Sequence, residues 1–195
     1  MLACVTSGDS LRADIVINDT PPTSAEISHT DLAQTRAPSV SGAWDLSCAR
    51  ALLERGELTI SSPGDALIFQ NVAGSPATAA DRMVFSYAPV ARPETVLTGV
   101  TCDQGLQVVT IISSGNPDRP ALSQDGELVA YFSGQTGMSA LYLAPFTADA
   151  ASTQLNNFSR DGFTPPPHRG PPTFDDSSMA VTWRSPRGAE RLELP

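Results

Sequence analysis

The sequence contains no lysine, and all twelve of its basic residues are arginines. They are outnumbered by 21 acidic residues, so the formal net charge is −9 at pH 7. This surplus of negative charge argues against nucleic acid or an anionic membrane surface as a partner, because both would repel the chain. Neutral or basic protein surfaces fit it better.

Long apolar runs are also missing. No segment approaches the roughly 20 apolar residues that a membrane-spanning helix needs. The 17 prolines and 14 glycines favour turns over long helices. With 195 residues, of which 41% are hydrophobic, the chain is long enough for one substantial domain, or for one domain with a tail.

Residues that carry catalysis are scarce. Only two histidines occur, His29 and His168, and a serine hydrolase triad would need one of them to meet a serine. No Gly-x-Ser-x-Gly sequence is present, since residues 137–141 read GMSAL. No paired cysteine or histidine spacing indicates zinc, and no glycine-rich loop indicates a phosphate site. We expect no catalytic residue, no cofactor and no enzyme activity.

Three turn aspartates are the candidates for calcium: Asp125, Asp175 and Asp176. Aspartates in turns more often accept hydrogen bonds from their own backbone. We therefore expect no metal site.

The three cysteines are informative by position. Cys4 follows Leu2-Ala3, which resembles the small-residue box before the lipid-modified cysteine of bacterial lipoproteins, although no apolar stretch precedes it here. Lipidation of Cys4 in a trimmed chain and an accidental match both stay open. Cys48 and Cys102 lie in different segments and would pair in an oxidising compartment. Two ordinary buried thiols are the equal alternative.

Residues 1–42 differ from the rest, because they hold linker residues and no aromatic side chain. Such a segment buries too little apolar surface to fold alone. We expect an extended N-terminal arm that packs on its own domain or docks on a partner, and a folded domain at residues 43–195. The apolar side chains expected at the partner contact are Leu11, Ile15, Val16, Ile17, Ile27 and Leu32.

The segment after the arm predicts a short helix over residues 45–54. Asp45 is a suitable N-cap, apolar residues recur at helical spacing, and Gly56 follows as a stop signal. This is the one helix of any length that we expect.

The strongest organising signal is a strand–turn–strand pattern at residues 120–146. The turn Asp125-Gly126 precedes the apolar run 128–132, and a glycine-containing loop separates that run from residues 140–143. Such turns between strand-length apolar runs predict antiparallel pairing.

Copies of this pattern predict a repeat protein. Residues 58–69 align on residues 120–131, and a further copy begins at residue 172. Three repeats are expected, at approximately residues 57–98, 105–158 and 170–195. The β-branched run 105–113 is expected as the innermost strand of the second repeat. Three unrelated hairpins are the alternative.

The motif resembles the repeats of TolB-like β-propellers. The residues that carry this resemblance are Pro120, Ser123, Asp125, Gly126, Ala130, Phe132, Ser133, Leu141 and Tyr142, and more weakly Asp175, Asp176, Ala180 and Trp183. The resemblance implies four-stranded blades that form a periplasmic protein-docking surface or a platform beside a peptidase domain. Propellers usually close with about four to eight blades, so three repeats imply an incomplete propeller with edges that need cover.

We therefore expect an all-β, partial propeller of TolB-like antiparallel blades, with a β-sandwich as the alternative fold. The expected function is that of a non-catalytic, extracytoplasmic binding or scaffolding subunit of a larger envelope or membrane-associated complex. Its attachment to the membrane would run through a Cys4 lipid or through partner subunits. The alternative is the propeller portion of a hydrolase or ligand-binding enzyme whose catalytic residues lie elsewhere.

Overall fold

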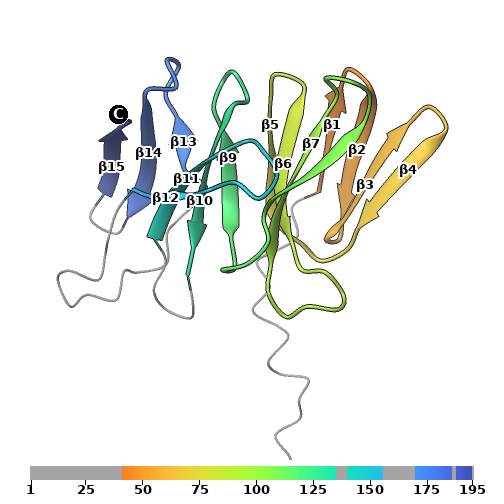
Figure 1. The fold of residues 1–195 in the computed structure, drawn as a ribbon, viewed down its shortest axis with the longest axis horizontal. Coiled ribbons are helices and arrows are strands. Elements are labelled where there is room, and N and C mark those ends of the chain that lie inside the picture. The colour runs from red at the N-terminus through yellow and green to blue at the C-terminus, as the bar shows by residue number, and fades with distance from the viewer. Residues whose placement is uncertain (1–40, 135–139, 156–169, 186–187, 195) are drawn as a thin grey trace, which may run out of the picture. The chain divides into compact units, whose positions relative to one another are not determined.

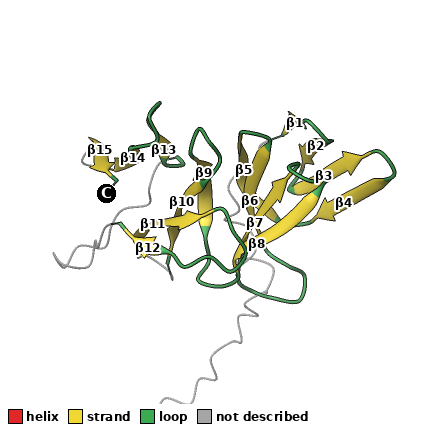
Figure 2. Ribbon diagram, turned by 45° about the horizontal axis from the view of Figure 1, so that its top comes forward, coloured by secondary structure: helices red, strands yellow, loops and turns green. Residues whose placement is uncertain are grey.

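The computed structural model describes residues 41–134, 140–155, 170–185 and 188–194, and in these ranges it contains strands and turns but no helix (Figures 1 and 2). The described strands form four antiparallel sheets. In every sheet each strand pairs with its neighbours in sequence, so each sheet is a simple meander. The chain is all-β, as expected. The arm predicted at residues 1–42 lies outside the described residues up to residue 40.

Sheet I contains β1 (Gly42–Leu46), β2 (Ala49–Glu54), β3 (Glu57–Ser62) and β4 (Asp65–Phe69). Sheet II contains β5 (Val72–Ala79), β6 (Arg82–Tyr87), β7 (Val96–Thr101) and β8 (Gln107–Ile112). Sheet III contains β9 (Asp118–Leu122), β10 (Leu128–Ser133), β11 (Ala140–Pro145) and β12 (Thr153–Gln154). Sheet IV contains β13 (Thr173–Phe174), β14 (Ala180–Ser185) and β15 (Gly188–Glu193).

The helix expected over residues 45–54 is wrong, because this segment forms the end of β1, a turn and β2. Along β2, buried Ala49, Ala51 and Leu53 alternate with exposed Arg50, Leu52 and Glu54. That alternation has the two-residue period of a strand with one buried face. The apolar residues that matched helical spacing lie on opposite faces of the hairpin. Their spacing was therefore wrongly interpreted as the period of a helix.

The predicted repeat boundaries agree with the sheets only at the end of the chain. The repeat at residues 57–98 contains the last two strands of sheet I and the first strands of sheet II, so this prediction is wrong. The run 105–113 holds β8, which is the last strand of sheet II and not the first of sheet III. A strand–turn–strand pattern has the same appearance at any place in a meander. The alignment of residues 58–69 on residues 120–131 therefore matched the last two strands of sheet I with the first two strands of sheet III.

Three separate hydrophobic cores lie between successive sheets. Leu53 and Ile60 of sheet I pack with Met83 and Phe85 of sheet II. Sheet II meets sheet III through the following buried side chains: Val84, Leu97, Ile111, Val129, Tyr131, Ala144 and Phe146. Sheet III meets sheet IV through Ala130, Phe132, Leu141, Val181 and Trp183. Sheets II and III are thus buried on both faces, which explains the continuous apolar runs of β6 and β10.

The first strands of sheets II, III and IV lie side by side, with β9 in contact with both β5 and β13. Meander sheets that pack face to face in succession, with their first strands together, are the blades of a β-propeller. A β-sandwich has two facing sheets, whereas four sheets follow one another here (Figure 1). The sandwich alternative is therefore wrong.

Candidate functional site

The turn between β9 and β10 is built around the hydroxyl of Ser123. This oxygen accepts a hydrogen bond from the Leu128 amide at 2.9 Å and donates one to Asp125 Oδ1 at 2.6 Å. The hydrogen bond from Ser123 is the main reason that the pKa of the Asp125 carboxyl lies below its usual value, and the Glu127 amide lowers it further. Gly126 has a φ of +74°, which explains why glycine follows the aspartate.

In the corresponding turn of sheet IV, Asp175 takes the place of Ser123. Its Oδ1 accepts hydrogen bonds from the Met179 and Ala180 amides at 3.0 and 3.1 Å. Desolvation raises the pKa of the Asp175 carboxyl, but the hydrogen bonds outweigh this effect and lower it. Ser178, with a φ of +57°, occupies the position of the glycine. The sequence indicated that Asp175 and Asp176 correspond weakly to the Asp-Gly motif. It did not predict that Asp175 takes the place of Ser123, or that Ser178 takes the place of the glycine.

Asp125 and Asp175 therefore bind to their own turns. Arg191 also donates to Asp175 Oδ2 at 2.9 Å. Within the residues that the structure describes, no cluster of three or more histidine, cysteine, aspartate or glutamate side chains is placed to hold a metal ion.

Arg82, at the start of β6, joins sheet II to the turn of sheet III. It donates to the Gly126 carbonyl and to Glu127 Oε1, each at 2.9 Å, and to Asp103 Oδ2 at 3.1 Å. Burial lowers the pKa of this guanidinium, but the two carboxylates outweigh it and raise the pKa. Nothing in the sequence marked Arg82, since one arginine at a strand end carries no motif.

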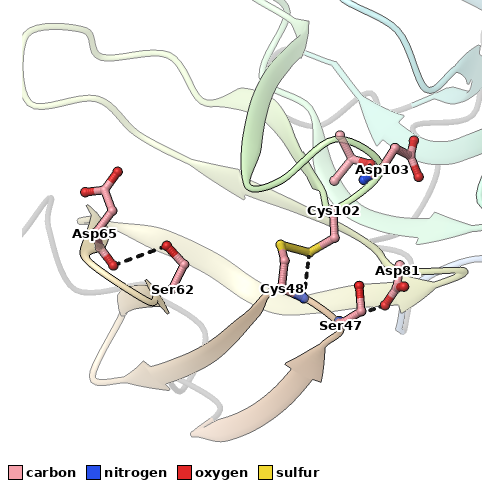
Figure 3. Close-up of a disulfide and its surroundings, with 8 residues drawn as sticks. Ser47, Cys48, Ser62, Asp65, Asp81, Cys102 and Asp103 are labelled. Atoms are coloured by element: carbon pink, nitrogen blue, oxygen red, sulfur yellow. Dashed lines mark hydrogen bonds between the residues drawn. A yellow bond between two sulfur atoms is a disulfide. The ribbon is translucent and has the colours of Figure 1, made fainter.

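Cys48 and Cys102 form a disulfide that joins the β1–β2 turn of sheet I to the end of β7 in sheet II (Figure 3). Their Cα atoms are 5.5 Å apart, within the range of disulfides. Beside the bridge, the Ser47 amide donates to Asp81 Oδ1 at 2.9 Å. Of the two alternatives left open by the sequence, the structure thus has the bonded pair.

A hollow of about 360 Å³ opens where the first strands of sheets II, III and IV meet. Its lining residues are Ser75, Pro76, Ala77, Thr78, Pro120, Ala121, Leu122, Pro171, Pro172, Thr173 and Phe174. None of these side chains is charged. The repeat motif begins at two of these residues, Pro120 and Pro172, but the sequence did not indicate a shared hollow, because the lining comes from three segments that only the fold brings together.

The lining offers apolar contacts and a few hydroxyl groups, but no carboxylate, imidazole or thiol. It can therefore bind a ligand, but it supplies no general acid or base for catalysis. His29 and His168 lie outside the described residues, as do Cys4 and the six apolar residues predicted for the arm contact.

No family model and no curated protein matches this chain. Among solved structures, a complex of KlAtg21 with the coiled coil of AgAtg16 matches 82% of this chain and 54% of the other, at 13% identity and a TM-score of 0.55. TolB from Acinetobacter baumannii matches 70% of this chain and 35% of the other, at 14% identity and a TM-score of 0.47. The β-propeller domain of the Trilobed protease from Pyrococcus furiosus matches 65% and 44%, at 14% identity and a TM-score of 0.42.

This chain spans about a third of the TolB chain and about half of the matched chain in the KlAtg21 complex. At identities this low the similarity concerns the fold alone. One of these solved structures is described as a β-propeller domain.

Proposed function

We propose that this chain is a non-catalytic binding subunit that docks a partner protein in the hollow between β5, β9 and β13. The observation that carries the proposal is the lining of that hollow, which has eleven residues and no charge on a chain of net charge −9. Concave, mainly apolar sites with a few polar groups are typical binding sites. The chemistry suits apolar side chains of a partner.

The prolines of the hollow determine how a partner would be recognised. β5, β9 and β13 each lie at the edge of their sheet and so present unpaired backbone groups. Pro76 in β5 and Pro120 in β9 have no N–H group to donate, which hinders the addition of a further strand. Recognition would therefore depend on side-chain packing against prolines and Phe174, rather than on strand pairing.

The disulfide supports a location outside the cytoplasm, because such bonds persist in oxidising compartments. No helix of sufficient length and apolar character to cross a membrane occurs in the described part of the chain. Membrane association would then run through the partner subunits of a larger complex, or through a lipid on Cys4.

The test is site-specific cross-linking in the native host. A photoreactive residue in place of Phe174, which lines the hollow, should capture a partner that the same residue in place of Gln107, exposed on β8, does not. Thr78→Glu should abolish this cross-link, whereas Thr110→Glu, a matched change on exposed β8, should leave it intact. Equal capture from both positions, or capture that survives Thr78→Glu, would contradict the proposal. Capture of a hydrolase by both positions would favour the enzyme-associated alternative.

A further inference from the structure

Sheet I has one buried face and one face that no other described sheet covers. Its even alternation places Ala51, Leu53 and Leu58 in the core with sheet II. The opposite face carries a row of cross-strand partners that runs over all four strands: Ala43, Leu52, Thr59 and Ile68. Leu52 is 44% exposed and Ile68 is 60% exposed. We call these four residues the outer row.

The outermost described sheet at the other end, sheet IV, has a different free face. Its central row is Thr173, Thr182 and Arg191. The hydroxyls of Thr173 and Thr182 lie 2.7 Å apart, and Arg191 is bonded to Asp175 and Glu193. This face satisfies its polar groups internally, as a face in water should. Of these two end faces, as far as the structure describes them, only that of sheet I has large apolar side chains exposed in a row, and such patches mark interaction sites.

Charges flank the outer row unevenly. On one side lie Asp45 and Arg50, which form an exposed ion pair at 3.7 Å. On the other side Glu54 and Glu57 are direct cross-strand partners, and both are exposed. Like charges directly opposite each other destabilise a sheet. Arg55 lies in the turn between them, but no ion pair in the described part of the chain joins it to either glutamate.

We propose that this face docks on the same face of a second copy of the chain, with the two-fold axis along the outer row. In this arrangement Leu52 and Ile68 meet their own counterparts. The axis reverses the strand direction, so Arg50 of each copy lies against Glu54 and Glu57 of the other. A two-fold axis along the strands would instead place the glutamate pair against itself. That second axis would leave the strands of the two copies parallel, so the charge pattern selects the antiparallel arrangement.

The size of the face sets the expected strength. Four strands spaced about 4.8 Å apart, each with about five residues of about 3.4 Å, cover roughly 300 Å² per copy. A standard interface buries about 800 Å² per partner. The dimer is therefore weak and depends on concentration. Docking on the polar sheet IV face of another copy would leave Leu52 and Ile68 against threonine and arginine, so the association ends at two copies.

A charge-swap experiment tests the arrangement with the full chain. Sedimentation velocity over roughly 1 μM to 1 mM, the range of weak complexes, should show wild-type monomer converting to dimer. Arg50→Glu alone and the double variant Glu54→Arg/Glu57→Arg should each weaken self-association at least roughly tenfold, because each places like charges together. An equimolar mixture of the two variants should restore a dimer, since both contacts are then of opposite charge.

Arg184→Glu, on the exposed face of sheet IV, is the matched control, because it alters the net charge as Arg50→Glu does and should leave association unchanged. Circular dichroism checks that each variant is folded. A wild-type chain that stays monomeric throughout overturns the proposal, whether residues 1–40 or another protein covers the face. A mixture of the two charge variants that associates no better than either alone overturns it as well.

Discussion

The guanidinium of Arg82 lies over the ring of Phe146, with 5.1 Å between the guanidinium carbon and the ring centroid. Phe146 follows β11 of sheet III, and its own amide donates to the Glu127 carbonyl at 2.8 Å. Arg82 bonds to the Glu127 side chain as well. One arginine of sheet II thus holds both the first turn of sheet III and the aromatic side chain packed beside it.

Replacing Arg82 should loosen the contact between sheets II and III. Its side chain is only 16% exposed, so Arg82→Ala removes packing on Phe146 together with three hydrogen bonds. We expect a loss of roughly 1–3 kcal/mol in the free energy of unfolding, measured by urea denaturation. Arg184→Ala, a change at an exposed position, should cost less than about 0.5 kcal/mol. Equal losses of unfolding free energy for the two substitutions would show that the Arg82 contacts do not contribute to stability.

Gly99 is required by the same aromatic ring. A Cβ atom on Gly99 would lie 2.4 Å from Phe146 Cζ and 3.1 Å from Ile111 Cδ1. Gly99→Ala should therefore destabilise the chain by roughly 1–3 kcal/mol through overpacking, seen as a lower thermal midpoint. Combined with Phe146→Leu it should cost less than the sum of the two single changes. Strict additivity would mean that the ring is not the obstacle.

The Cys48–Cys102 disulfide should contribute to stability by closing a long loop, since 54 positions separate the two cysteines. The double variant Cys48→Ser/Cys102→Ser should lose about 2–4 kcal/mol, measured by denaturation without reductant. Dithiothreitol should lower the stability of the wild-type chain to a similar level and leave the double variant unaffected. A wild-type chain insensitive to reductant would contradict the bonded pair or its contribution.

The titration of Asp125 should depend on Ser123. Folding lowers the pKa of this carboxyl below its ordinary value of about 3.9. The folded chain then binds fewer protons than the unfolded one, so this stabilisation is present above the ordinary pKa and is lost as pH falls through the folded pKa. Ser123→Ala removes the largest cause, and the pKa of Asp125 should rise in a carbon NMR titration. Ser177→Ala, in the equivalent turn of sheet IV, should leave it unchanged.

The sequence was sufficient where local chemistry determines structure. The Asp125-Gly126 turn and the strands predicted after it, at residues 128–132 and 140–143, agree with β10 and β11, because the turn residues and the apolar runs favour the same structure. The sequence was insufficient where the structure that a residue pattern adopts depends on the strands that pair with it. Leu52 counted toward a helix because four apolar residues shared a helical spacing, and only pairing with β1 and β3 shows it exposed on a strand.

The candidate site could not be predicted from the sequence for a related reason. The lining of the hollow comes from residues 75–78, 120–122 and 171–174, and although the repeat motif related the second and third of these segments, nothing in the sequence indicated that all three meet around one hollow. Arg82 was missed because its partners, Gly126 and Glu127, lie more than forty positions away. The disulfide was predicted as one of two alternatives, because a pair of cysteines in a sequence indicates a possible bond. A single arginine or proline indicates no particular contact.

The separation of the cores has a consequence for how the molecule opens. Each core is shared by only two neighbouring sheets, so an unfolding event need not involve the whole domain, as in repeat proteins. A covalent bond joins sheets I and II, whereas in the described part of the chain the three-stranded sheet IV is held by one core and by a hydrogen bond that the Gln124 amide donates to the Ser178 hydroxyl. The domain should therefore fray from one side, and amide hydrogens of β14 should exchange long before those of β7.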